Sequence, residues 1–286
     1  MPDRRYDETA YYDFEKNYAN AVDLTRRVFG HDRADKLLAA KGQSKRTDFM
    51  TAMTWGWWLH RPVMEMADRV ICILGALAPK AMEKGLRDYL QLGLAIGLHR
   101  EKLREAMFIL SVYGGVPRAE WALAIVDDLC AELDAAGWKP FTVPTRPYQG
   151  EERDYYDFDH NFPSGIDMSI RLFGDRGGTR DERLARQGES SIGDFQAIHW
   201  GWLNQRPILS PRERSLFLIG LDSAVLGHLA LKDHVQWALE AGVKREQIME
   251  AMTMLYMYNG WPANREALVT VAEWLAELDR RANASG

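Results

Sequence analysis

The sequence is poor in cysteine and has no long apolar run. Its 286 residues include only Cys72 and Cys130, too few for a disulfide framework and typical of a reducing compartment. No stretch of eighteen apolar residues occurs, so we expect no membrane span. The first eight residues contain no apolar core, and the sequence predicts no signal peptide. A cytoplasmic protein with no membrane partner is therefore expected.

The sequence also lacks a strong excess of charge. Its formal net charge is −5 and it has no basic run, which argues against a nucleic-acid partner. The charged share of 27% and the hydrophobic share of 47% are those of a globular protein whose length allows a sizeable core. The ten tryptophans fit either core packing or the walls of a pocket for a flat ligand.

An internal repeat runs along the chain at an offset of about 145 residues, a spacing typical of domain duplication rather than of a short solenoid repeat. Trp55-Gly56-Trp57 returns as Trp200-Gly201-Trp202, and Arg61-Pro62 returns as Arg206-Pro207. We therefore expect two tandem copies of one module. The expected domains are a first module over 1–138, a proline-rich linker over 139–152 and a second module over 153–286.

Each module is expected to be all-helical. In the second copy, Ser210 to Glu213 reads as a capping box with proline at the first helical position. The patterns predict helices over 211–226, 228–241, 245–258 and 263–281. No period-2 strand pattern appears, and no glycine-rich loop follows a strand as in a nucleotide fold.

The order of these motifs resembles the carboxymuconolactone decarboxylase family, whose fold is shared with alkyl hydroperoxidase D. The resemblance covers about 207–280, and a weaker version covers about 62–135. The residues that carry it are Leu209 to Arg214 at a helix start, His234 eight residues before Gly242, Lys244 to Ile248 at the next helix start, and the turn Tyr258 to Ala263. It implies an all-α fold that oligomerises through helix packing, so we expect a homo-oligomer, with a trimer favoured.

The proteins that share this fold carry out two types of chemistry, and the resemblance allows either. The peroxidase branch uses a Cys-x-x-Cys pair shortly before the histidine, and Gly227 and Ala230 stand there. No thiolate nucleophile is therefore available at that place. The decarboxylase branch implies a reaction with no metal and no organic cofactor, and we expect neither here.

The candidate catalytic residues are His234, Glu213 and Tyr258. His234 shares a helical face with apolar residues, so it is expected to point inward as an acid or base. A hydrogen-bonded core histidine is the competing interpretation. Glu213 also has a structural explanation, because it closes the capping box with Ser210. Tyr258 belongs to the same candidate set, and a pocket lined by His234, Tyr258 and Trp202 would count against a non-catalytic scaffold.

The candidate substrate-binding residues all lie in the second copy. Arg206 and Arg214 could bind the carboxylate of a substrate. Both arginines recur in the first copy, so a structural ion pair is equally compatible. His199, His228 and Asn259 stand where the first copy has different residues. This asymmetry favours a site in the second copy. The spacing of His228 and His234 does not suggest a metal. The full set is Arg206, Arg214, His199, Trp202, His228 and Asn259.

The preferred function is a cofactor-independent lyase of carboxymuconolactone decarboxylase type. It would act on a small cyclic or aromatic-derived carboxylic acid by carboxylate clamping and acid–base proton transfer. An isomerase or another C–C lyase needs similar groups. Two alternatives remain open: an alkyl hydroperoxidase-like antioxidant protein without the cysteine pair, and a non-catalytic ligand-binding or scaffold protein.

Overall fold

The structure is a computed structural model that describes residues 12–142, 157–174, 178–186, 193 and 195–284. Every regular element of this described part is a helix, and no strand occurs in it. The all-α prediction is therefore confirmed. None of the helices in these ranges is long and apolar enough to cross a membrane. Most of the expected linker lies outside the described residues, and the domain boundaries stay a prediction.

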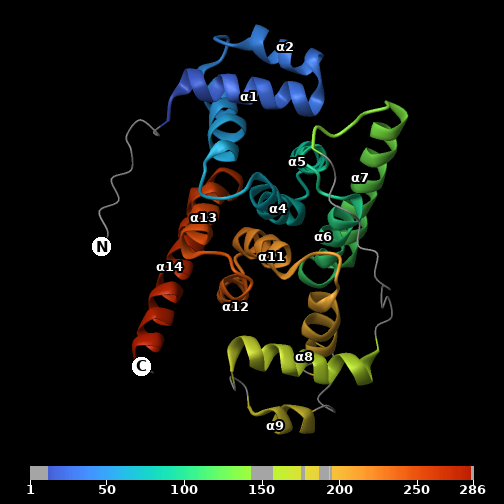
Figure 1. The fold of residues 1–286 in the computed structure, drawn as a ribbon, viewed down its shortest axis with the longest axis vertical. Helices are drawn as coiled ribbons and strands as arrows, with labels where there is room; N and C mark the ends of the chain where they lie inside the picture. The colour runs from blue at the N-terminus through green and yellow to red at the C-terminus, as the bar shows by residue number, and fades with distance from the viewer. Residues whose placement is uncertain (1–11, 143–156, 175–177, 187–192, 194, 285–286) are drawn as a thin grey trace.

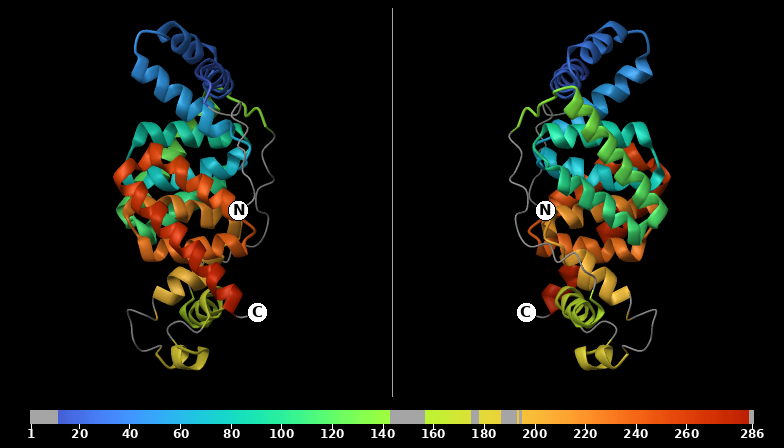
Figure 2. Two further views of the ribbon diagram at one scale, coloured as in Figure 1. Left: turned by 90° about the vertical axis from the view of Figure 1, so that its left-hand side faces the viewer. Right: turned by 90° about the vertical axis from the view of Figure 1, so that its right-hand side faces the viewer.

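The first half starts with a helical hairpin at one end of the molecule and continues into the central bundle (Figures 1 and 2). Its elements are α1 (Phe14–Phe29), α2 (His31–Ala40), α3 (Lys45–Thr51), η2 (Ala52–Trp57), η3 (Trp58–His60), α4 (Met66–Leu77), η4 (Ala78–Lys80), α5 (Glu83–Ala95), α6 (Arg100–Tyr113) and α7 (Val116–Ala135).

The second half follows the same order, and its α8 and α9 lie at the opposite end (Figures 1 and 2). Its elements are α8 (Phe158–Phe173), α9 (Arg180–Ala185), η5 (Gln196–Trp202), η6 (Leu203–Gln205), α11 (Pro211–Val225), α12 (His228–Glu240), α13 (Arg245–Asn259) and α14 (Trp261–Ala284). Of its four expected bundle helices, the first three end within one residue of their predicted bounds. The fourth starts two residues earlier and ends three residues later.

The halves meet where α4 and α11 cross at the centre of the bundle (Figure 1). A Cβ on Gly75 would lie 2.0 Å from the Phe217 carbonyl oxygen, and one on Gly220 would lie 2.0 Å from that of Cys72. Only glycine permits this backbone approach. The crossing buries α4 and α11 in one hydrophobic core that both halves share.

Charged side chains also cross between the halves. In each half two arginines contact a glutamate that belongs to the other half. The pairs are Arg61 and Arg69 with Glu250, and Arg206 and Arg214 with Glu105. All of these contacts lie at the edge of the shared core, so each half completes the other's ion pairs.

The Trp-Gly-Trp motifs form π-helical segments, η2 and η5, that pack against α1 and α8. In the second half a Cβ on Gly201 would lie 1.8 Å from the Asn161 carbonyl oxygen, and Asn161 Nδ2 donates to the Gly201 carbonyl over 2.9 Å. Glycine is thus required for this contact. The contact holds η5 against α8 and points His199 toward the bundle, a use of π-helical turns that is common at functional sites.

Candidate active site

His234 lies on α12 and faces inward, as the sequence predicted. Its side chain is 1% exposed, and its Nδ1 lies 2.5 Å from Oδ2 of Asp222 on α11. Burial raises the pKa of Asp222, and the adjacent His234 opposes that rise. The carboxylate binds the Nδ1–H of His234, which leaves Nε2 to face the other groups of the site.

Tyr113 is the last residue of α6 and comes from the first half of the chain. Its hydroxyl lies 3.1 Å from Nε2 of His234 and also contacts Nε2 of His199. Burial raises the pKa of Tyr113 well above its ordinary value, with the charge of Asp222 as a smaller cause. The hydroxyl therefore keeps its proton at neutral pH and joins the two imidazoles.

His199, on η5, is held in its neutral form. Burial lowers its pKa well below the ordinary value, and His234 lowers it further. When Tyr113 donates its proton to Nε2 of His234, its oxygen accepts the Nε2–H of His199. The Nδ1 atom of His199 then remains as a bare acceptor inside the protein.

Three buried polar side chains around Tyr113 have unfilled hydrogen-bonding capacity. Nδ1 of His199, the carboxamide of Asn204 and Nη1 of Arg214 have no hydrogen-bond partner among the described residues. Asn204 is 4% exposed and Arg214 is 0% exposed. Each such group costs about 1–3 kcal/mol when it is left unsatisfied. The cluster therefore has donors and an acceptor that a small polar molecule could satisfy.

The corresponding positions of the first half show no such cluster. Tyr89 and Tyr258 bond to each other through their hydroxyls, and the hydroxyl of Thr54 donates to a backbone carbonyl one turn earlier. Leu59 stands where the second half has Asn204, and Nη1 of Arg69 pairs with a carboxylate of the other half. Unfilled polar capacity is thus concentrated on the His234 side, which agrees with the asymmetry seen in the sequence.

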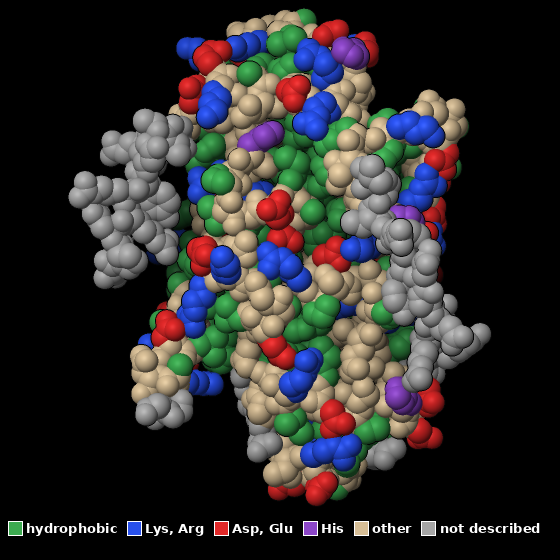
Figure 3. All heavy atoms as spheres, viewed as in Figure 1, with side chains coloured by type: hydrophobic (Ala, Val, Ile, Leu, Met, Phe, Trp, Pro, Cys, Tyr) green, Lys and Arg blue, Asp and Glu red, His purple; other side chains and the backbone are tan. Residues whose placement is uncertain are grey.

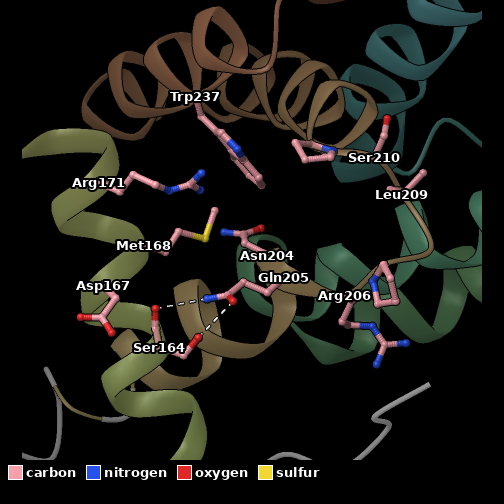
Figure 4. A pocket seen from close by; sticks show the side chains of 12 residues that line it. Ser164, Asp167, Met168, Arg171, Asn204, Gln205, Arg206, Leu209, Ser210 and Trp237 are labelled. Atoms are coloured by element: carbon pink, nitrogen blue, oxygen red, sulfur yellow. Dashed lines mark hydrogen bonds between the residues drawn. The ribbon is translucent and has the colours of Figure 1, made fainter. Parts of the chain in front are cut away.

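Two arginines lie on the inner wall of the site. Nε of Arg206 donates to both Glu105 oxygens over 2.9 and 3.0 Å, and Nη2 of Arg214 donates to the same carboxylate over 3.0 Å. Two guanidinium groups thus share one carboxylate. The side chain of Arg206 points away from the neighbouring cavity in Figure 4, so Arg214 is the better placed to meet an anionic ligand.

A cavity of about 420 Å³ opens beside this cluster, between α8, η6 and the start of α11. Trp237, whose ring centroid is 6.4 Å from that of His234, lies on its wall, and Asn204 lies at its inner end (Figure 4). Its lining is Ser164, Asp167, Met168, Arg171, Asn204, Gln205, Arg206, Pro207, Leu209, Ser210, Pro211 and Trp237.

The structure places two predicted site residues away from His234. Tyr258 pairs with Tyr89 across the halves, and Asn259 accepts from Nζ of Lys80 over 2.8 Å on that same side. The prediction that Tyr258 lies beside His234 was wrong, because Tyr258, at the end of α13, lies beside Tyr89 of the first half instead. Tyr113, the counterpart of Tyr258, occupies the place beside His234.

Two further candidates have structural partners outside the cluster. Glu213 closes the capping box, with the Ser210 backbone N–H donating over 2.9 Å, and its other oxygen accepts from Lys102 over 2.6 Å. His228 lies at the start of α12, where its Nδ1 is 3.2 Å from the hydroxyl of Thr270. These contacts favour structural roles for both residues.

Trp202 packs edge-on against Phe108, with ring centroids 5.8 Å apart, and stacks beneath the guanidinium of Arg206. It borders a second cavity of about 400 Å³ with Glu105 and Arg206. Trp202 therefore supports the arginine that holds Glu105 and lies on a different cavity from Asn204.

Sequence reasoning missed three members of the cluster, which are Tyr113, Asp222 and Asn204. The repeat does pair Tyr113 with Tyr258, but it carries no sign that the two halves exchange these tyrosines. Asp222 and Asn204 replace Leu77 and Leu59 of the first half. A search for polar residues at positions that are apolar in the other copy would have found both.

Comparison with known proteins shows that part of the chain is similar to one family. Residues 194–274 match the model of the carboxymuconolactone decarboxylase family. A nitrosuccinic acid decarboxylase of Metarhizium robertsii is 32% identical over 95 residues, which cover 33% of this chain and 64% of that protein. The match thus spans less than two thirds of this relative.

A 4-carboxymuconolactone decarboxylase of Acinetobacter baylyi is 21% identical over 124 residues, which cover 43% of this chain and 92% of that protein. The matched residues include His199, Asn204, Arg214, Asp222 and His234. The all-helical fold agrees with this similarity, which covers residues 194–274 and the groups around His234.

Proposed function

We propose that the chain is a cofactor-independent decarboxylase of a small carboxylic acid, with its site at His234. The observation that carries this proposal is the buried cluster of His199, Asn204 and Arg214, whose unfilled hydrogen-bonding capacity surrounds the Tyr113 hydroxyl. Both relatives are named as decarboxylases, and this supports the reaction class.

In the proposed reaction, Arg214 attracts the anionic substrate to the cluster. The bond between the carboxyl carbon and its neighbour breaks, CO2 leaves, and the electron pair stays on the substrate carbon. That carbon takes the proton of the Tyr113 hydroxyl. A proton from solvent then protonates His234 at Nε2, and the imidazolium passes it to the tyrosinate oxygen, so that both groups return to their starting forms.

The remaining groups stabilise the charges that form during this reaction or keep water away from it. The Asp222 carboxylate, 2.5 Å from Nδ1, stabilises the imidazolium of His234 before it gives up its proton. The Nη1 of Arg214 and the amide of Asn204 stabilise the anion that remains after CO2 has left. Trp200 and Trp237, which pack against His234, keep water from the reacting carbon.

Replacement of His234 tests the proposal. A panel of small cyclic and aromatic-derived acids is screened for CO2 release by the wild-type protein, and the active substrate is carried to single-turnover rates. We expect His234→Ala to lower the rate by about 10²–10⁴-fold with the helical fold retained. Tyr89→Phe is the matched control, because Tyr89 holds the corresponding position in the first half, and it should cost much less.

Normal single-turnover rates in folded His234→Ala would sink the proposal. Conversion of the substrate without CO2 release would also overturn the decarboxylation and would move the site to isomerisation or another C–C cleavage.

A further inference from the structure

We infer that Glu105 is a positioning residue for the reaction at His234, because it holds Nη2 of Arg214 and so leaves Nη1 of that arginine to bind the carboxylate of the substrate. The inference rests on the proposed function, since it concerns the same site, and it gives a role to a residue of the first half. Its starting point is that Arg214 is 0% exposed, while its Nη1 has no hydrogen-bond partner among the described residues.

The contacts that orient Arg214 lie on Nη2. This nitrogen donates to Oε1 of Glu105 over 3.0 Å and to the backbone carbonyl of Arg206 over 2.8 Å. Both of its hydrogens are thereby engaged, and they set the orientation of the guanidinium, because the group is planar. The charge of Arg214 lowers the pKa of Tyr113 against the larger effect of burial. The guanidinium therefore lies near the hydroxyl that joins the two imidazoles.

The equivalent arginine of the first half is bound differently. Nη1 of Arg69 donates to Oε1 of Glu250 over 3.0 Å, and its Nη2 donates to the backbone carbonyl of Arg61 over 2.8 Å. The residue types and the carbonyl contact are those of the second half, but here the carboxylate takes Nη1 instead of Nη2. The placement of the glutamate therefore decides whether Nη1 is engaged.

The neighbouring arginine holds the glutamate differently in the two halves. Arg61 binds Glu250 with two nitrogens, Nε to Oε1 over 2.5 Å and Nη2 to Oε2 over 2.9 Å. Arg206 meets both oxygens of Glu105 through Nε, over 2.9 and 3.0 Å. The two carboxylates are thus held in different orientations relative to the arginines that they share.

The aromatic rings beside these neighbouring arginines differ as well. The guanidinium carbon of Arg206 lies 5.2 Å from the ring centroid of Phe108, which is on α6 like the glutamate. In the first half Thr253 stands at the place of Phe108, and the guanidinium carbon of Arg61 lies 5.0 Å from a ring of Trp58 on η3. The cation–π contact with Phe108 attracts Arg206 toward α6. Phe108 therefore helps to set how Arg206 meets the carboxylate.

The arrangement indicates what Nη1 of Arg214 binds. Its N–H groups are donors and carry positive charge, so the matching partner is an anionic oxygen. A carboxylate bound to Nη1 is held close to the Tyr113 hydroxyl, which gives its proton in the proposed reaction. Glu105 thus serves the reaction without touching the substrate.

Calorimetric binding of acetate tests this without any turnover. Acetate is the probe because it carries one carboxylate and little else, and we expect the wild-type protein to bind it. Glu105→Asp keeps the charge but shortens the side chain by one methylene. It should weaken acetate binding about tenfold, the size expected for loss of one hydrogen bond to a charged group. Glu250→Asp is the matched control, because it makes the same change where Nη1 is already engaged, and it should leave acetate binding unchanged.

A purely structural role predicts another result. Glu105→Asp and Glu250→Asp would then lower the melting temperature alike and leave acetate binding as it is. Phe108→Thr keeps every ion-pairing group, and it should weaken acetate binding several-fold; it decides the matter if Glu105→Asp does not fold. His234→Ala should bind acetate as the wild type does, so failure of the catalytic role and failure of this inference are separate results. No acetate binding by the wild-type protein, unchanged binding in the folded Glu105 or Phe108 variant, or an equal loss in Glu250→Asp would overturn the inference.

Discussion

The Tyr113 hydroxyl lies 3.1 Å from Nε2 of His234, although the two residues are 121 positions apart and belong to different halves. The reverse exchange brings Tyr258 of the second half to Tyr89 of the first. Each half therefore supplies a tyrosine to the other's position. Among the described residues, the position at Tyr113 is the one that combines its tyrosine with two buried imidazoles.

Removing the hydroxyl of Tyr113 should lower turnover, whereas removing the matched hydroxyl of Tyr258 should not. We expect Tyr113→Phe to lower turnover by about 10²-fold, because the proton relay between His234 and the substrate is broken. Tyr258→Phe removes the matched hydroxyl of the first-half position and should leave turnover nearly unchanged. Rates of CO2 release for the two variants, with melting curves as a check of folding, make the comparison. Equal losses in both would contradict the assignment.

The neutral state of His199 should appear in the pH dependence of stability. Its folded pKa is lowered well below 6.5 by burial and by His234, so the unfolded chain binds the proton more readily. The resulting stability is present above pH about 6.5 and is lost as pH falls below that value, by at most about 1.4 kcal/mol per pH unit.

His199→Gln removes this titration. Its unfolding free energy should therefore fall less between pH 7.5 and pH 5 than that of the wild-type protein, whatever the variant costs at pH 7.5. Denaturant titrations at both pH values measure the difference. A wild-type protein and a variant with parallel pH curves would show that His199 is not held neutral.

The crossing of α4 and α11 should be intolerant of any side chain. Gly220→Ala places a Cβ against the Cys72 carbonyl oxygen, and the helices must separate. We expect a loss of about 4 kcal/mol or more, the upper range for core disruption. Gly85→Ala is the control, because its nearest contact is the Leu77 side chain at 3.7 Å, and it should stabilise α5 by up to about 1 kcal/mol. Chemical denaturation of both variants measures the two changes in the free energy of unfolding, and equal changes would contradict the prediction.

The two thiols should take no part in turnover. Cys72 is fully buried, and burial raises its pKa to about 12; burial also raises the pKa of Cys130. We expect the double variant Cys72→Ser with Cys130→Ser to keep most of its turnover if folded, and alkylation of the native protein to have no effect on rate. Complete loss of turnover in a folded double variant would instead support thiol chemistry.

The protein should be a homo-oligomer, with a trimer favoured. Several large apolar side chains of the described residues are exposed in the single chain, among them Leu229 on α12 at 82% and Trp261 at the start of α14 at 58%. On the face seen in Figure 3, hydrophobic side chains are interspersed with charges of both signs. Light scattering gives the mass directly, and a strictly monomeric value would refute the expectation.

The helices of the second half could be predicted closely from the sequence because local signals define them. The capping box at Ser210 and the left-handed glycine at Gly242 mark helix ends by interactions within a few residues. The inward direction of His234 followed from the apolar residues on its face. None of these signals depends on how the halves are arranged.

The site could not be predicted in the same way, because its composition depends on the exchange between halves. Tyr113 and Glu105 reach the second half only because α4 and α11 cross at Gly75 and Gly220. A repeat in the sequence gives equal reason to assign each tyrosine to its own copy. The assignment of Tyr258 to His234 failed for this reason.

The Arg–Glu contacts between the halves have a consequence for how the two copies can diverge. Glu105 belongs to the half whose own tyrosine position lacks an acid–base pair, yet it holds Arg206 and Arg214 on the opposite side. Tyr113 comes from that half as well. A substitution in the first half therefore changes the surroundings of His234 in the second. If the reaction takes place at His234, the sequence of the first half is constrained by chemistry that lies outside it, and neither half could be removed without loss to the other.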